Sequence, residues 1–186
     1  MLELLSFARH HGGIPIKPNI VAIAAVTIDG KIARHAGHFP DWTSPEDTTF
    51  FHSILDKSAA LVVGHNTYKT AEKPLSKRNC IVFSSTVQDT ERRRENLLFY
   101  NAAGPTSIES ILEPYKFVAV LGGTLIYSYF LERDFIDDFY LTIEPIVFGN
   151  GLSLFNHEST SAKRLRLASV RPLNEQGTVL LHYKRP

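Results

Sequence analysis

The chain has 186 residues, 44% of them hydrophobic and 21% charged, a composition typical of a globular protein that buries its own core. Its formal net charge of +1 argues against a general nucleic-acid-binding surface, and no stretch approaches the roughly 20 apolar residues that cross a bilayer. The single cysteine excludes an intrachain disulfide and fits a reducing compartment. We therefore expect a soluble, cytoplasmic protein whose partner is a small molecule, not a nucleic acid or a membrane.

Residues 1–18 are predicted to be an N-terminal extension, and residues 19–186 to form the folded domain. The sequence His10-His11-Gly12-Gly13 and two prolines interrupt any regular pattern in the first segment. The two adjacent histidines lack the second, spaced pair of ligands that a metal site needs, so no metal is predicted. An acid at Glu3 also distinguishes this segment from a signal peptide, which has a basic head and an apolar run.

From residue 20 onward, apolar runs alternate with segments of helical periodicity. Strands are expected at 20–26, 60–63, 80–83, 117–121, 137–148, 164–171 and 178–185. Helices are expected at 45–57, 66–71, 107–113 and 124–132. The first four strands are continuously apolar, as in a sheet covered on both faces, whereas the last two alternate apolar and polar residues. The pattern predicts an α/β fold with a mainly parallel central sheet, an antiparallel C-terminal edge and helices on both faces.

Three of the expected strands end in polar or glycine-rich segments. These segments are Gly64-His65-Asn66-Thr67, Ser84-Ser85-Thr86 and Leu121-Gly122-Gly123-Thr124. Free backbone N–H groups at a helix start bind anions, and ligands of open α/β sheets bind beyond the carboxyl ends of the strands. Any one segment would also suit an ordinary strand-to-helix connection, but three on one edge fit one extended nucleotide. Neither a Gly-x-Gly-x-x-Gly motif nor a Walker motif is present, which disfavours a Rossmann or P-loop protein.

Asp47 has two interpretations, which the residues alone leave open. Ser44 is a natural N-cap followed by Pro45, so Asp47 falls at the third helical position and would form half of a capping box. Alternatively, with Trp42 before it and Phe51 one helical turn after it, the acid faces an aromatic-lined site. A carboxyl group desolvated in such a site would have a raised pKa, and it would bind a flat amidine-like group or assist protonation.

In their order and spacing, several motifs resemble those of the dihydrofolate reductase family over residues 20 to 145. The motifs are Ala24-Ala25-Val26 before Asp29-Gly30-Lys31-Ile32, Trp42-x-x-Pro45-x-Asp47-x-x-x-Phe51, Gly64-His65-Asn66-Thr67-Tyr68, Pro74-Leu75-x-x-Arg78-Asn79, Ile81-Val82-Phe83-Ser84-Ser85, Leu121-Gly122-Gly123 with Tyr127, and Tyr140-Leu141-Thr142. The resemblance implies a dihydrofolate-reductase-like fold and NADPH-dependent reduction of 7,8-dihydrofolate to 5,6,7,8-tetrahydrofolate. Such an enzyme serves folate and one-carbon metabolism.

The resemblance also implies roles for individual residues. Asp47 matches the catalytic acid that holds the pterin, Thr142 matches the hydroxyl that supports this acid, and Arg78 matches the arginine that clamps the glutamate carboxylate of folate. The other residues assigned to the substrate are Ile23, Phe51 and Leu75. Those assigned to NADPH are Ala25, Ile32, Gly64, His65, Asn66, Thr67, Ser84, Ser85, Leu121, Gly122, Gly123, Thr124, Leu125 and Tyr127.

Parts of the chain depart from this pattern. Residues 136–151 look more like the riboflavin-pathway reductases, which reduce a 5-amino-6-ribosylaminopyrimidine phosphate with NADPH, and this substrate stands as the alternative. A non-catalytic nucleotide-binding module is an alternative of another class, and a homodimer is left open. His65 and Leu125 stand where basic side chains are frequent, so a weaker or pH-dependent grip on the 2′-phosphate of NADPH is expected.

Overall fold

The computed structural model describes residues 17–156 and 162–186. Its helices are α1 (Pro45–Lys57), α2 (His65–Leu75), α3 (Ile108–Leu112) and α4 (Thr124–Glu132). Its strands are β1 (Asn19–Thr27), β2 (Lys31–Ala33), β3 (Ala60–Gly64), β4 (Cys80–Phe83), β5 (Thr90–Arg94), β6 (Leu97–Tyr100), β7 (Phe117–Val120), β8 (Asp138–Glu144), β9 (Leu152–Ser153), β10 (Arg166–Pro172) and β11 (Val179–Lys184). Most of the expected N-terminal extension, including His10 and His11, lies outside the described residues. None of the helices within the described ranges is long and apolar enough to cross a membrane.

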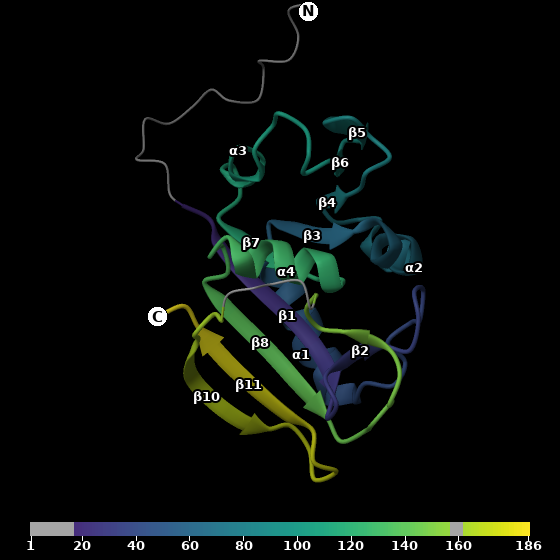
Figure 1. Cartoon of the computed structure of the whole chain (residues 1–186), viewed down its shortest axis with the longest axis vertical. Helices are drawn as coiled ribbons and strands as arrows, with labels where there is room; N and C mark the ends of the chain where they lie inside the picture. Colours follow the sequence, from purple (N-terminus) through teal and green to yellow (C-terminus); the bar gives the residue numbers. More distant parts are fainter. Residues whose placement is uncertain (1–16, 157–161) are drawn as a thin grey trace, which may run out of the picture.

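Nine of the strands form one twisted sheet in the order β10-β11-β8-β1-β7-β3-β4-β6-β5 (Figure 1). The six central strands from β8 to β6 run parallel, whereas β10 and β11 at one edge and β5 at the other are antiparallel to their neighbours. The carboxyl ends of the parallel strands therefore meet along a single edge of the sheet. The fold expected from the sequence is confirmed, with one additional antiparallel strand at the β5 edge.

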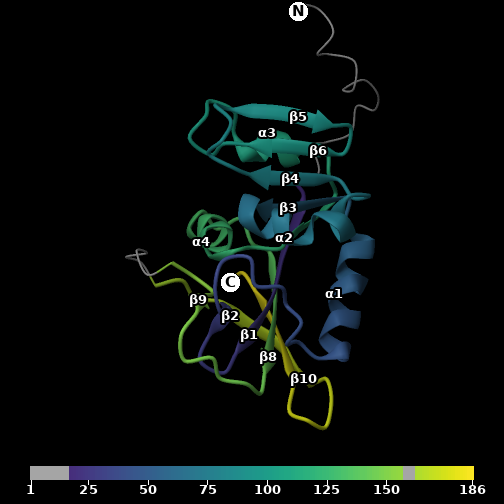
Figure 2. The same ribbon diagram turned by 90° about the vertical axis from the view of Figure 1, so that its right-hand side faces the viewer.

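Two apolar clusters cover the two faces of the sheet. Along β1, Ile20, Ala22 and Ala24 belong to one cluster, and Val21 and Ile23 belong to the other, because successive side chains of a strand point to opposite faces. The first cluster packs under α3 and α4, and the second packs under α1 and α2, so α1 and α4 lie on opposite sides of the sheet (Figure 2).

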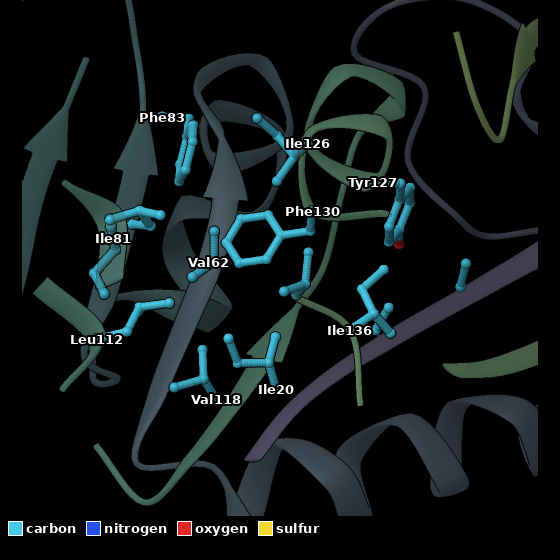
Figure 3. Close-up of a cluster of buried hydrophobic side chains, with 14 of the residues drawn as sticks. Ile20, Val62, Ile81, Phe83, Leu112, Val118, Ile126, Tyr127, Phe130 and Ile136 are labelled. Atoms are coloured by element: carbon cyan, nitrogen blue, oxygen red, sulfur yellow. The ribbon is translucent and has the colours of Figure 1, made fainter. Parts of the chain in front are cut away.

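At the centre of the first cluster, Phe130 of α4 lies against Val62 of β3 (Figure 3). Both side chains are completely buried. At about 25 cal/mol for each Å² of apolar surface removed from water, this packing is the main stabilisation of the fold.

The local signals placed most elements well. The expected bounds of α1 and α4 are confirmed, and Ser44 accepts a hydrogen bond from the backbone N–H of Asp47, as an N-cap does. Strand β8 ends at Glu144, earlier than expected, because Pro145 has no N–H to donate to a sheet. The sequence does not predict the hairpin of β5 and β6, because β5 is exposed throughout and carries no apolar alternation. It does not predict the β2–β9 pair either, because both strands are very short and their partners are distant in sequence.

Candidate active site

Two helices begin at the carboxyl edge of the sheet without a side-chain cap. Helix α2 follows β3 at Gly64, and α4 follows β7 at Gly123; neither glycine has a side chain that could bond the first backbone N–H groups. Strands β3 and β7 are neighbours, and the N–H of Gly64 donates to the carbonyl oxygen of Gly122 at 2.7 Å. The two helix starts therefore lie side by side, with their N–H groups and positive dipole ends available to an anion.

The glycines at these starts let side chains of the two helices pack directly against the backbone. A Cβ atom on Gly64 would lie 3.2 Å from Cγ1 of Ile126, and one on Gly123 would lie 3.4 Å from Oγ1 of Thr67. Gly122 has φ +85°, a conformation that favours glycine, and a Cβ atom there would overlap the ring of Tyr127. The Gly122–Gly123 peptide is cis. Uncapped N–H groups beside bare backbone fit a pyrophosphate group.

A second polar cluster lies further along the same edge, where β4 ends. Ser84 Oγ lies 3.1 Å from Nδ1 of His65 and 2.8 Å from the hydroxyl of Thr86. Burial lowers the pKa of His65, and the positive charges of Lys69 and Arg93 lower it further. Because the imidazole is held neutral, positive charge at this cluster comes from Lys69 and Arg93.

Arg93 is not among the residues expected from the sequence. Its guanidinium lies 3.7 Å from the ring centroid of Phe99, and the ring of His65 meets the same phenyl ring edge-on at 5.3 Å. The run Arg92-Arg93-Arg94 before an apolar segment was a visible signal, but only the β5–β6 hairpin shows which arginine faces the cluster. The Arg93 guanidinium also pairs with Glu91 at 2.8 Å, an exposed ion pair of the kind that contributes little and that a phosphate could replace. Arg93 thus brings a positive charge close to His65 from another strand.

The remaining cofactor candidates divide into exposed and buried residues. Asn66, Ser85 and Leu125 are exposed, and Leu125 has 68% of its surface free on the first turn of α4. Ala25 and Ile32 are partly buried, and a Cβ atom on Gly123 would lie 4.0 Å from Cδ1 of Ile32, which places Ile32 at the two-glycine turn. Two further candidates at this turn, Leu121 and Thr124, are also partly buried.

Tyr127 packs beneath the two-glycine turn and is not exposed at its surface. Its side chain lies in the first apolar cluster (Figure 3) and is 3% exposed. Its hydroxyl donates to the carbonyl oxygen of Ile23 at 2.6 Å. With the ring beneath Gly122 and the hydroxyl already bonded, the direct cofactor contact expected for Tyr127 gives way to a packing role. The same bond occupies the carbonyl oxygen of Ile23, whose side chain is buried in the core.

Asp47 lies buried at the start of α1, with only 6% of its surface exposed. Burial is the main cause of its raised pKa, and the nearby charge of Glu144 raises the pKa further. The hydroxyls of Thr142 and Thr43 favour the charged carboxylate and partly oppose this shift. Across the described part of the chain no lysine, arginine or histidine pairs with Asp47, so the carboxyl group is desolvated without a compensating cation.

Thr142 has an unsatisfied hydroxyl beside this acid. The side chain is fully buried on β8, and among the described residues its Oγ1 atom has no hydrogen-bond partner. The hydroxyl is thus close enough to favour the charged form of Asp47 but does not complete a hydrogen bond with it. Buried polar groups without partners are rare in folded proteins, and one next to a buried carboxyl group indicates a place that a ligand completes.

The capping-box interpretation of Asp47 is wrong. The backbone N–H of Ser44, which a capping-box acid would bind, donates instead to Oε1 of Glu144 at 2.7 Å. The backbone N–H of Asp47 donates to the Ser44 hydroxyl, at 3.2 Å. The carboxyl group is therefore not used to cap its own helix.

Asp47 and the two-glycine turn meet at Tyr127. Thr142, whose hydroxyl acts on Asp47, pairs in the sheet with Ala25 of β1, and the Tyr127 hydroxyl bonds the carbonyl oxygen of Ile23 two residues earlier on that strand. Burial raises the pKa of Tyr127, and the charge of Asp47 raises it further. The same ring lies directly beneath Gly122. The acid and the anion-binding edge therefore belong to one site.

Arg78 lies at the other end of α1 from Asp47, and its guanidinium is already bonded. It donates to the carbonyl oxygen of Leu55 at 2.7 Å and pairs with Asp56 at 2.6 Å. Leu55 follows Asp47 by eight residues, or about 12 Å along a helix. Phe51 and Leu75 belong to the apolar cluster on this face of the sheet. Arg78 thus does not offer an unpaired cation to a substrate carboxylate.

The turn between β1 and β2 and the loop between β2 and α1 both contact the segment after β8. Asp29 accepts hydrogen bonds from the backbone N–H groups of Phe148 at 3.1 Å and Gly149 at 2.8 Å, and the hydroxyl of Thr27 lowers the pKa of this acid. Trp42 meets the ring of Phe148 edge-on at 5.1 Å, and its indole N–H is buried without a partner among the described residues. These contacts fix the path of the chain into α1.

Comparisons with known proteins agree with this arrangement. Residues 19–145 match the family model described as dihydrofolate reductase, and residues 113–179 match the model described as RibD C-terminal domain. The uncharacterised protein YwjB of Bacillus subtilis (strain 168) is 29% identical over 89% of this chain and 97% of its own length.

Solved structures of both kinds share the fold. A putative riboflavin biosynthesis protein from Shewanella sp. PV-4 has a TM-score of 0.72 and 22% identity, covering 90% of this chain and 99% of that one. A diaminohydroxyphosphoribosylaminopyrimidine deaminase/5-amino-6-(5-phosphoribosylamino)uracil reductase from Thermotoga maritima has a TM-score of 0.68 and 21% identity, covering 91% and 57%. Dihydrofolate reductase from Enterococcus faecalis, complexed with NADP(H) and RAB-propyl, has a TM-score of 0.63 and 22% identity, covering 91% and 98%.

Fold and family matches together point to an oxidoreductase of the α/β class that includes dihydrofolate reductase and the RibD reductase domain. Because the dihydrofolate reductase model matches more than half of the sequence, the chain belongs to the dihydrofolate reductase family. The expected resemblance, including its features of the riboflavin branch, is confirmed.

Proposed function

We propose that the protein is an NADPH-dependent reductase of the riboflavin-pathway kind, acting on a 5-amino-6-ribosylaminopyrimidine phosphate. The observation that carries a reductase function is the buried, unpaired carboxyl group of Asp47 next to the two-glycine turn. The match of residues 113–179 to the RibD C-terminal domain supports the choice of substrate. The reductase named in the Thermotoga maritima structure acts on a substrate of this chemical class.

The residues at the sheet edge fit NADPH as cofactor. The N–H groups at the starts of α2 and α4, which no side chain caps, would bind the pyrophosphate. Ser84, Lys69 and Arg93 offer a hydroxyl and two positive charges to the 2′-phosphate, the group that distinguishes NADPH from NADH. When bound, NADPH would supply a hydride from C4 of its nicotinamide ring.

Reduction of a ribosylaminopyrimidine converts the ribosyl group to a ribityl chain. A hydride is added to C1 of the ribose, the bond from that carbon to the ring oxygen breaks, and the oxygen takes up a proton. Asp47 and the free hydroxyl of Thr142 would hold the amino-substituted edge of the pyrimidine, as acceptor and donor. A carboxyl group with a raised pKa also keeps its proton to higher pH than an ordinary aspartate, which suits it to proton delivery.

Dihydrofolate is the second candidate substrate. The family model over residues 19–145 and the positions of Asp47, Phe51 and Thr142 favour it. The bonding of Arg78 argues against it, because the ion pair with Asp56 would have to open before the arginine could hold the glutamate carboxylate of folate. A substrate without this distant carboxylate needs no such rearrangement.

The test is NADPH oxidation followed at 340 nm with each substrate in turn. We expect turnover with the ribosylaminopyrimidine phosphate and at least tenfold lower kcat/KM with dihydrofolate. Faster turnover of dihydrofolate, together with tight binding of methotrexate, would reverse the choice. NADPH binding without reduction of either compound would make the protein a non-catalytic nucleotide-binding module instead.

A further inference from the structure

A buried chain of hydrogen bonds joins the turn of the C-terminal hairpin to the start of α1. Oε1 of Glu144 accepts the backbone N–H of Ser44 at 2.7 Å, and Oε2 accepts the hydroxyl of Thr178 at 2.7 Å. Glu144 is 3% exposed and Thr178 is 1% exposed, so the bond between them is shielded from water, and the bond to the partly buried Ser44 is partly shielded. Figure 2 shows this end of α1 close to the hairpin of β10 and β11.

The turn between β10 and β11 is also hydrogen-bonded to the start of α1 through Asn174. Asn174 accepts the N–H of Thr178 at 3.0 Å and donates to its hydroxyl at 3.1 Å, which shapes the turn. The same amide group donates to the carboxylate of Glu46 at 3.0 Å. The turn is therefore linked to two points, Ser44 and Glu46, on either side of the first residue of α1.

Glu144 takes over a bond that the acid of the helix would otherwise make. A helix with an N-cap serine and an acid at its third position commonly closes a capping box, in which that acid binds the N-cap N–H. Here the N–H of Ser44 is bonded by a carboxylate 100 residues away. The carboxyl group of Asp47 is thereby left unused inside a buried site.

We propose that Glu144 is a positioning residue of the active site, which binds the Ser44 amide in place of Asp47 and so holds the Asp47 carboxyl group free to face the substrate. The role in catalysis rests on the function proposed above, whereas the bonding role does not. The hairpin turn at 173–178 then has a function, as the anchor that fixes Glu144 from its other side through Thr178.

The bonding predicts how the acid responds to a change at Glu144. Two titratable groups face Asp47 from neighbouring elements, Glu144 on β8 and Tyr127 on α4. Glu144→Gln keeps an oxygen for the Ser44 amide and an amide group for the Thr178 hydroxyl, but it removes the negative charge. The pKa of Asp47 should therefore fall in this variant while the fold is retained.

The experiment is a pH titration of the side-chain carboxyl carbons of aspartate by ¹³C NMR, with Asp47 assigned by its absence in Asp47→Asn. Glu46→Gln is the matched control, since it removes an exposed charge from the same turn of the same helix. We expect the Asp47 pKa to fall in Glu144→Gln and to remain unchanged in Glu46→Gln. An unchanged pKa in Glu144→Gln, or equal shifts in both variants, would overturn the proposal.

A second measurement keeps the proposal testable if Glu144→Gln does not fold. In Asp47→Asn, the amide resonance of Ser44 and its protection from hydrogen exchange should match those of the parent, because Glu144 still binds that amide. Loss of this protection would show that Asp47 is the true partner and contradict the proposal. Neither measurement needs a substrate, so a failure here is distinct from a failure of the proposed reaction.

Discussion

The four helices of the described chain start in two different ways. Helices α1 and α3 begin at Ser44 and Ser107, whose hydroxyls accept hydrogen bonds from the backbone N–H groups of their own first turns. Helices α2 and α4 begin at Gly64 and Gly123 and have no side-chain cap. The capped starts are complete within the protein, whereas the uncapped starts lie side by side at the carboxyl edge of the sheet. The difference indicates which backbone N–H groups are reserved for a ligand.

Filling the space at the uncapped turn should have the largest effect. In Gly122→Ala the new methyl group would overlap the ring of Tyr127 at a positive φ, so we expect a loss of about 3 kcal/mol in the free energy of unfolding and loss of NADPH binding. Gly30→Ala is the control, because Gly30 also has a positive φ (+74°) but has open space around it. Urea denaturation should show a cost of about 1 kcal/mol there. Equal costs in the two variants would contradict the packing role of Tyr127.

Removing the charge of the buried Asp47 should lower the catalytic activity but raise the stability of the fold. We expect Asp47→Asn to lower kcat/KM by about 100-fold, since the residue is proposed to act in proton transfer and substrate binding. The folded-state pKa of Asp47 is raised, so its ionisation costs stability as the pH rises through that pKa. The variant should therefore be more stable than the parent at neutral pH, and the gain should shrink as the pH falls. A variant less stable than the parent at neutral pH would show that the carboxylate is favourably bonded.

Substitutions of Arg93 and its neighbour Arg92 test whether the cluster of Ser84, Lys69 and Arg93 binds the 2′-phosphate of NADPH. Arg93→Ala should weaken NADPH binding by about tenfold, or about 1.4 kcal/mol, and leave NADH binding unchanged. Arg92→Ala is the matched control on the same strand, because the charge of Arg93 acts on His65, whereas the Arg92 guanidinium is bonded to the carbonyl oxygen of Glu95. Isothermal titration with both nucleotides measures the difference. A similar loss for NADH would show that Arg93 acts on another part of the cofactor.

Removing the cap of a capped helix should lower the free energy of unfolding without changing NADPH affinity. Ser107→Ala removes the hydroxyl that accepts the N–H of Ser110, which should cost about 1 kcal/mol in the free energy of unfolding. NADPH affinity should not change, because α3 is already complete and takes no part in the site. Weaker NADPH binding in this variant would contradict the claim that only the uncapped helix starts bind the cofactor.

Local signals were sufficient to predict part of the fold and of the site. Ser44 with Pro45 placed the start of α1, and the two glycines before Thr124 placed the start of α4, because caps and turns depend on neighbouring residues. The aromatic neighbours of Asp47 mark it as a candidate site residue, but the sequence does not decide between a site role and a helix-capping role. The structure decides it, because Glu144 and not Asp47 accepts the backbone N–H of Ser44.

What the sequence did not predict depends on contacts between distant residues. Arg93 reaches the cluster at His65 only through the β5–β6 hairpin, and Glu144 reaches Ser44 across 100 residues. The bonding of Arg78 by Asp56 likewise requires the ends of two helices to be placed together. Periodicity and capping patterns carry no information about such pairs.

The most direct test of the central claim is a titration of ¹⁵N-labelled protein with NADPH, followed by backbone amide shifts. We predict that the largest changes occur at residues 64–67 and 122–126, where the uncapped helices begin, with little change at residues 107–110 of the capped helix α3. Unchanged amides at both uncapped starts in the presence of bound NADPH would contradict the claim.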